Sequence, residues 1–440
     1  MVEGFCEELN APRSRPRMQD SKLRSRLKAQ LTKFSSELCA GLSRPLEKFV
    51  TQMLFGIQAS QDVKLSNIAR SLREDIPLIK TEDRLSRNLK TAELETELTS
   101  QLAKMASQRV DANTVLCLDL SDIRKEYAKK MEYLAPVHDG STGEVHAGYW
   151  LCDVTGAEVN GSEIVPLYQK LYSAEAKEFV SENAEVLAGI DLVRAHTRGR
   201  GIWTVDRGGD RKKLLEPLLD RHERFVIRST GKRFVIDRKK VSRSVAELGA
   251  RCRLRHQARV VKIEDGQEKT DDLRYGVERI RLVGRPEQLC LVVVAGFGEE
   301  PMLLLTNALD GARDSQSLWW IARIYLTRWK IEETFRFIKQ SYNLEDIRVM
   351  KYQRLKNLVV LVTAAAYFAA TFLGQKMKLR ILCEKLLIIS QRFFGIPPFR
   401  FYALADGIKN VLSQSSPGPP PEALPNLQME LLLGWDGVEI

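Results

Sequence analysis

Five polar side chains recur at helical spacing in the segment IYLTRWKIEETFRFIKQ, residues 324–340. An α-helix turns about 100° per residue, so all five fall within a sector of about 80°. They are Tyr325, Arg328, Glu332, Arg336 and Lys339. Mostly apolar side chains occupy the other side, which predicts one amphipathic helix with an acid among bases on its polar face. Simple i,i+4 ion pairing on a solvated face would explain the same spacing.

Two further acids stand out upstream. Asp119 lies inside TVLCLDLSD, a predicted strand in which an unpaired charge would be costly. Asp206 ends the predicted strand in GIWTVDRG. Acids from two strands and a helix that meet at one point would form a cage for Mg²⁺ or Mn²⁺, which prefer hard oxygen ligands. Two such ions can drive phosphodiester cleavage, while the bases beside Glu332 would hold the nucleic-acid phosphates.

Each strand acid also has a purely structural explanation. Asp119 could pair with a core arginine, and Asp122 is its rival on the opposite face of the strand. Asp206 could cap the helix that follows, a role for which Asp210 competes.

The helix acid has a structural explanation as well. Glu332 could be half of a surface ion pair with Arg328 or Arg336, worth less than ~1 kcal/mol. Glu333 is adjacent but lies about 100° away around the helix. The order of strand acid, strand acid and basic-faced helix nevertheless favours a metal-dependent nuclease.

The elements that must position these residues divide the chain into five regions. Residues 1–108 are expected to be helical, with a helix that begins at a Thr81 cap and carries Arg84 and Arg87 on one face. A helix–turn–helix DNA reader has this pattern, as does a helical pair with a solvated basic face. The remaining regions are an α/β stretch (109–232), a basic β-rich stretch (233–305), a helical stretch (306–375) and a helical end with a Pro/Ser-rich tail (376–440).

Composition narrows the class of protein. A net charge of +11 and a pI of about 9.2 favour a polyanionic partner, most often nucleic acid. Seven scattered cysteines without a C-x-x-C pair indicate reduced thiols. The N-terminus lacks a signal peptide, and the longest apolar run, residues 358–373, is short for a membrane span. We therefore expect a cytoplasmic protein that does not contact the membrane.

The spacing Tyr325-x2-Arg328-x3-Glu332-x6-Lys339 resembles the Tyr-Arg-Glu-Lys signature of DDE transposases of bacterial insertion sequences, in the family called insertion sequence four. LCLDLSDI resembles the first acidic block of that family, with Asp119 at the catalytic position. WTVDRGGDR resembles the second, with Asp206 as the catalytic acid. The resemblance covers roughly residues 20–375 and implies a ribonuclease-H-like α/β core, interrupted by the β-rich insertion and preceded by a helical region that binds transposon ends.

The resemblance also implies an activity. The protein would be a transposase that hydrolyses phosphodiesters at transposon ends and transfers the strands into target DNA by cut and paste. By carry-over, Asp119, Asp206 and Glu332 would ligate two Mg²⁺ ions, with Mn²⁺ as the alternative, while Tyr325, Arg328, Lys339 and Arg336 would contact phosphates. The partners would be double-stranded DNA, as inverted-repeat ends and as target, and a second copy of the chain in a synaptic homodimer at the bacterial nucleoid.

Two other functions are considered. A regulator or domesticated copy would keep the fold and bind DNA without cutting it, whereas a structure-specific nuclease would use the same core without joining ends. Some members of the family flip a base onto an aromatic ring near a hairpin, and Trp319, Trp320 and Phe297 are the candidates here. The basic run 231–244 is either a DNA track or a solvated strand edge.

Overall fold

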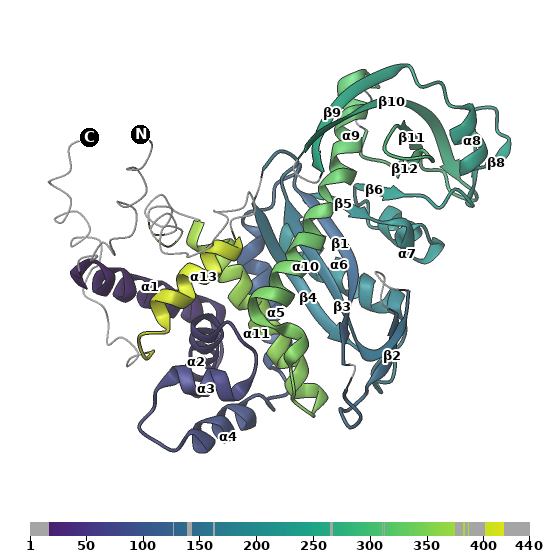
Figure 1. The fold of residues 1–440 in the computed structure, drawn as a ribbon. Helices are drawn as coiled ribbons and strands as arrows, with labels where there is room; N and C mark the ends of the chain where they lie inside the picture. The colour runs from purple at the N-terminus through teal and green to yellow at the C-terminus, as the bar shows by residue number, and fades with distance from the viewer. Residues whose placement is uncertain are drawn as a thin grey trace, which may run out of the picture.

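The protein is described by a computed structural model in which a long β-sheet forms the centre and helices cover it (Figure 1). This arrangement confirms the predicted mixed α/β class. The structure describes residues 17–125, 127–138, 143–161, 163–264, 267–309, 311, 313–374, 382, 386 and 401–417.

Five helices precede the sheet, as predicted for this region. They are α1 (Arg17–Leu38), α2 (Arg44–Ser60), α3 (Leu65–Leu72), α4 (Leu78–Asn88) and α5 (Leu94–Ser107). The predicted start of α4 at Thr81 is wrong, because the helix begins at Leu78, directly after Pro77. Proline sets its own φ near the helical value, so it readily precedes a first turn. Thr81 is instead buried, and its hydroxyl donates to Glu74 at 2.8 Å.

The first half of the sheet has five neighbouring strands in the order β4-β3-β1-β5-β6. The antiparallel strands are β1 (Val115–Arg124), β3 (Val145–Ala157) and β4 (Ile164–Tyr172), and short β2 (Ala135–His138) pairs with the start of β3. β5 (Ile202–Val205) and β6 (Phe225–Arg228) run parallel to β1. Parallel neighbours need crossover connections, and here these contain α6 (Glu182–Thr197), the 3₁₀ turn η1 (Arg207–Gly209) and α7 (Lys212–Asp220).

The β-rich region after β6 continues the same sheet. Its last strand pairs antiparallel with β6, and the order from there is β6-β12-β11-β10-β7-β8, with β9 on β10. The elements are β7 (Phe234–Ile236), β8 (Ser242–Ser244), α8 (Val245–Arg251), β9 (His256–Glu264), β10 (Gln267–Leu282), β11 (Leu289–Ala295) and β12 (Met302–Thr306). The insertion in sequence is therefore an extension of the central sheet in space.

The predicted single helix across residues 324–340 is wrong, because the segment contains the end of α9 (Ser315–Thr327) and most of α10 (Trp329–Tyr342). The break falls at Arg328. The Arg328 amide donates to the Tyr325 carbonyl at 3.1 Å, and the Ile331 amide donates to the Arg328 carbonyl at 2.9 Å. These bonds span three residues rather than four, so the backbone tightens at the junction.

The apolar run after α10 forms a buried helix, as predicted. It lies in α11 (Tyr352–Ala370), which follows η2 (Leu344–Asp346) and precedes η3 (Phe372–Gly374). Within the described residues, no helix has the length and apolarity to cross a membrane. The last described helix is α13 (Phe401–Leu412), and the predicted Pro/Ser-rich tail lies mostly outside the described residues.

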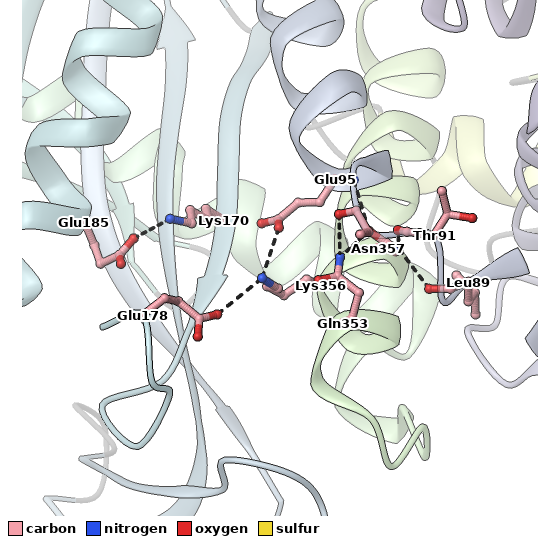
Figure 2. Close-up of polar contacts among 10 residues, drawn as sticks. Leu89, Thr91, Glu95, Lys170, Glu178, Glu185, Gln353, Lys356 and Asn357 are labelled. Carbon is pink, nitrogen blue, oxygen red and sulfur yellow. Dashed lines mark hydrogen bonds and ion pairs between the residues drawn. The ribbon is translucent and has the colours of Figure 1, made fainter. Parts of the chain in front are cut away.

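A buried asparagine joins the helical N-terminal region to α11. Figure 2 shows Asn357 on α11, which is fully buried and reaches the chain between α4 and α5. Its side-chain nitrogen donates to the carbonyls of Leu89 at 2.8 Å and Thr91 at 2.7 Å, and its oxygen accepts from the Glu95 amide at 3.0 Å. Nearby, Lys356 lies between Glu95 and Glu178 at 3.6 and 3.4 Å. These contacts fix the position of α5 on the sheet.

We predict that Asn357→Leu lowers the free energy of unfolding by about 2–4 kcal/mol, because it leaves two carbonyls and one amide buried without a partner. Urea denaturation followed by circular dichroism measures the change. Gln353→Ala is the control, because it removes the bond from Gln353 to the Asn357 oxygen at 3.2 Å but leaves the two carbonyls and the Glu95 amide paired with Asn357; it should cost less than about 1 kcal/mol. Equal losses in both variants would show that Asn357 has no special role.

Candidate active site

The register of two parallel strands places Asp119 beside Asp206. In the pairing of β1 with β5, Cys117 is opposite Thr204. Side chains alternate between the faces of a sheet. Asp119 and Asp206 each come two residues after this pair, so both lie on the face that Cys117 and Thr204 share. One oxygen of Asp206 accepts from the Gly208 amide at 2.8 Å. Asp206 therefore caps η1, and a carboxylate retains acceptor capacity beyond one such bond.

The guanidinium of Arg328 connects the first acid to the third. It donates to Asp119 Oδ2 at 3.0 Å and to Glu332 Oε1 at 2.8 Å. Arg328 is 8% exposed, and its guanidinium carbon lies 5.9 Å from the centre of the Tyr325 ring. The break between α9 and α10 thus puts a buried positive charge between two of the three predicted catalytic acids.

The electrostatics indicate that all three acids lie near one another. Burial raises the pKa of Asp119 from its ordinary 3.8 to about 6. The positive charge of Arg328 opposes this rise, whereas the negative charges of Asp206 and Glu332 add to it. The ionised form of Asp119 is therefore less favourable in the fold than in water, as is common for side chains at catalytic sites.

The rival of Asp206 has a structural role in this fold. The Asp210 side chain is fully buried and forms an ion pair with Arg233. It also accepts hydrogen bonds from the Ser229 hydroxyl at 2.7 Å and from the Thr230 amide at 2.9 Å. These bonds hold the chain that leaves β6, and together with the Arg233 pair they keep the pKa of Asp210 below its ordinary value although burial opposes this.

The other two rivals also have partners. Asp122 lies 3.8 Å from the Lys339 ammonium, and Glu333 forms an ion pair with Arg336. Neither acid is among the leading causes of the raised pKa of Asp119. Asp119, Asp206 and Glu332 therefore lie near one another, whereas the alternatives are engaged by partners of their own.

The residues predicted to contact DNA lie in different surroundings. Tyr325 is only 3% exposed and packs among apolar residues of α9. Lys339 lies 3.4 Å from Glu345 in addition to its contact with Asp122, whereas the Arg336 side chain is 55% exposed. Access to solvent is thus greatest at Arg336.

The two predicted DNA contacts in the N-terminal region differ in the same way. Arg84 donates to both carboxylate oxygens of Glu74 at 2.7 Å and to Gln52 at 3.1 Å. Arg87 is exposed one turn away on α4. Arg84 holds the chain between α3 and α4 in place, and Arg87 points to solvent.

The chemistry of the three acids fits a hard divalent cation. Asp119, Asp206 and Glu332 supply only carboxylate oxygens, which Mg²⁺ and Mn²⁺ prefer. Among the described residues, however, no three His, Cys, Asp or Glu side chains are close enough to hold a metal ion together. Arg328 takes the space between Asp119 and Glu332, so a cation shared by those two carboxylates would require the guanidinium to move.

One exposed aromatic residue at this site was missed from the sequence. Trp329 follows Arg328 directly and is 59% exposed. It lies about 40° from Tyr325 on the helical wheel, about 20° beyond the polar sector, and this closeness to the polar face was a signal. Trp319 and Trp320, the rings expected instead, line a pocket with Asn113, which lies just before the amino end of β1.

We predict that Asp119→Asn raises the free energy of unfolding at pH 8 by up to about 3 kcal/mol, because the pKa of Asp119 is about 6 in the fold and lower in the unfolded chain. Folding thus favours the protonated acid, and the penalty on the charged form develops as the pH rises through about 4 to 6. The gain from Asn should disappear near pH 4. Urea denaturation with EDTA at both pH values measures it, and equal stability at pH 8 would contradict the prediction.

Comparison with known proteins covers the later part of this site. Residues 180–368 match the family model of the transposase DDE domain, a segment that includes Asp206 and Glu332 but not Asp119. Among solved structures, the chain is similar to the piggyBac transposase in a synaptic complex with hairpin DNA, with a TM-score of 0.43 and 11% identity, over 91% of this chain and 86% of that chain. No curated protein matches. The match over residues 180–368 supports a DDE transposase.

Proposed function

We propose that the protein is a DNA transposase of the insertion sequence four type, which cuts DNA at transposon ends and joins the strands to target DNA by cut and paste. The observation that carries this proposal is that Arg328 joins Asp119 on β1 to Glu332 on α10, while the register of β1 with β5 sets Asp206 near Asp119. The match of residues 180–368 to the transposase DDE domain supports it.

The strand order supports a ribonuclease-H-like core for this activity. Three antiparallel strands are followed by two parallel strands, and the first strand, β1, lies in the middle of the order β4-β3-β1-β5-β6. In this order the carboxyl end of β5, which Asp206 follows, lies beside the middle of β1, which carries Asp119. We propose that residues 109–232 and 306–375 form this core, that 1–108 bind transposon ends, that 233–305 are an insertion and that 376–440 are an accessory C-terminal region.

The three carboxylates are proposed to hold two Mg²⁺ or Mn²⁺ ions. When bound, such ions activate a water or a 3′-hydroxyl and stabilise the leaving oxygen of a phosphodiester. Arg328 would leave its carboxylate partners for a DNA phosphate, which a guanidinium binds through two hydrogen bonds. Arg336 and Lys339 would hold phosphates further along α10. Tyr325 would support Arg328 through the contact between its ring and the guanidinium.

The proposed substrates are double-stranded inverted-repeat ends and target DNA. Synapsis of two ends would require a second copy of the chain, so a homodimer is proposed. The net charge of +11 suits both kinds of DNA. The proposed place of action is the bacterial cytoplasm, at the nucleoid.

We predict that Glu332→Gln abolishes cleavage and preserves binding, because the swap keeps the size of the side chain and removes one metal-binding charge. Mutation of a residue that only supports a metal ligand lowers metal affinity or activity about 10–100-fold. Mutation of a ligand itself should therefore lower the cleavage rate more than a hundredfold. The assay uses labelled DNA that carries the sequences flanking the gene, with Mg²⁺ and with EDTA.

Glu333→Gln is the matched control for this experiment, since it makes the same change at the next residue and breaks only the pair with Arg336. It should cut within a few fold of wild type. Equal cutting by the Glu332 variant would sink the assignment of the third acid. Binding without cutting by wild type under every metal would favour a DNA-binding protein that has lost catalysis, and cutting without strand joining would favour a structure-specific nuclease.

We further predict different outcomes at two neighbouring arginines. Arg87→Ala should weaken binding to end DNA and lower the salt slope of binding by about one, with stability unchanged. Arg84→Ala should lower the free energy of unfolding by about 1–2 kcal/mol, because it removes the half-buried partner of Glu74. Fluorescence anisotropy and urea denaturation of both variants test this. If both variants bind end DNA as well as wild type, α4 is not part of the DNA interface.

A further inference from the structure

A buried arginine engages the oxygens of two acids that the proposed function assigns to metal. Arg328 donates through Nη1 to Asp119 Oδ2 at 3.0 Å and through Nη2 to Glu332 Oε1 at 2.8 Å. The other oxygen of Asp119 accepts from the Leu120 amide at 2.9 Å. Both oxygens of Asp119 and one of Glu332 thus accept hydrogen bonds, and each bond uses acceptor capacity that a metal ion would need.

The position of Arg328 differs from that of the neighbouring cations. Within the part of the chain that the structure describes, Asp119 and Glu332 form ion pairs with Arg328 alone. Lys339 and Arg336, the other cations of α10 that were predicted to contact DNA, pair with different acids. Any competition between a protein cation and a metal ion for these two carboxylates therefore depends on Arg328.

Arg328 also offsets the negative charge that would attract a metal ion. Asp119, Asp206 and Glu332 are all acids, and the affinity of a carboxylate site for a hard divalent cation depends on the number of charged ligands. The guanidinium lies within hydrogen-bond distance of two of them, where opposite charges attract strongly. The same acids therefore bind a divalent cation less tightly while Arg328 remains between them.

One nitrogen of the same guanidinium is not used by the acids. Nε of Arg328 is buried and has no hydrogen-bond partner among the described residues. Buried polar atoms are usually paired, so the two acids leave Arg328 incompletely satisfied. A phosphate accepts two parallel hydrogen bonds from one guanidinium. It can therefore take Nε together with Nη2, the nitrogen that otherwise donates to Glu332.

We propose that Arg328 keeps Mg²⁺ from Asp119 and Glu332 until a DNA phosphate takes its guanidinium, so that DNA and the metal bind cooperatively. This inference rests on the proposed function, because it concerns the regulation of the same acids. Without DNA, Arg328 satisfies the two carboxylates. Once a phosphate accepts from Nε and Nη2, the carboxylate oxygens are free to ligate a hard cation. By linkage, the metal raises the affinity for DNA by the same factor as DNA raises the affinity for the metal.

The first test measures Mn²⁺ binding to the full-length protein without DNA, from the electron paramagnetic resonance signal of the free ion. Arg328→Gln should bind Mn²⁺ at least tenfold more tightly than wild type, because glutamine removes the competing charge and keeps a donor. Arg323→Gln is the matched control and should bind like wild type, since Arg323 is half-buried on α9 and has no ion pair among the described residues. Equal affinities of Arg328→Gln and wild type would show that Arg328 only holds the fold, which would overturn the proposal.

A double variant tests whether the gain belongs to the acids. Asp119→Asn added to Arg328→Gln should abolish the tighter Mn²⁺ binding, because it removes one of the carboxylates that Arg328 releases. A gain that persists in the double variant would place the ion elsewhere and would overturn the proposal.

The wild-type protein tests the role of DNA without any substitution. DNA that carries the sequences flanking the gene should raise its Mn²⁺ affinity at least tenfold, after subtraction of the ions that the DNA binds alone. In Arg328→Gln the same DNA should raise the affinity by a factor at least threefold smaller, because the acids are already released. No rise in wild type would overturn the proposal whether or not Arg328→Gln folds, and equal factors in the two proteins would overturn it as well.

These measurements separate this inference from the proposed function, because none of them is a cleavage assay. If wild type cuts DNA but its Mn²⁺ affinity does not depend on Arg328, the transposase proposal stands and this inference is overturned. If Arg328→Gln gains Mn²⁺ affinity through Asp119 but wild type never cuts DNA, this inference stands and the result counts against the proposed function alone.

Discussion

The parallel pairing of β1 with β5 is the constraint on which the site depends. It aligns Cys117 with Thr204 and so brings Asp119, in the middle of β1, near Asp206, which follows the carboxyl end of β5. Like charges at a buried position are unfavourable, and Arg328 offsets part of the cost by reaching Asp119 and Glu332 at once. Arg328 lies at the backbone break between α9 and α10. The same residue therefore marks the interruption of the helix and supplies the positive charge between the acids.

Much of this could be read from the sequence. The apolar runs that form β1 and β5 are recognisable in the sequence, because strands that are largely buried on both faces are continuous in hydrophobicity. β4 is not predicted from the sequence. Its Pro166 is unfavourable in a strand, yet the sheet accommodates it opposite Thr155, beside a register shift in β3. The pairing of β12 with β6 joins segments distant in sequence, which local patterns do not report.

The candidate site was predictable to a similar degree. Residue type and order selected Asp119, Asp206 and Glu332, whereas their rivals could be set aside only once tertiary partners were known, as with Arg233 for Asp210. A helical wheel assumes one straight helix. It therefore placed Tyr325 on a solvated face, although the break at Arg328 and the sheet beneath α9 leave that ring 3% exposed.

The mixed polar face of residues 324–340 follows from these two helices meeting different surroundings. Arg328 satisfies its charge on acids inside the protein, Lys339 shares Asp122 and Glu345, and Arg336 remains largely in water. An approaching phosphate must compete with two carboxylates for Arg328 and with two for Lys339. For Arg336 it competes only with solvent and Glu333. Long-range attraction of a phosphate thus depends mainly on Arg336. If a phosphate then took Arg328 away from Asp119 and Glu332, its arrival would free these two carboxylates.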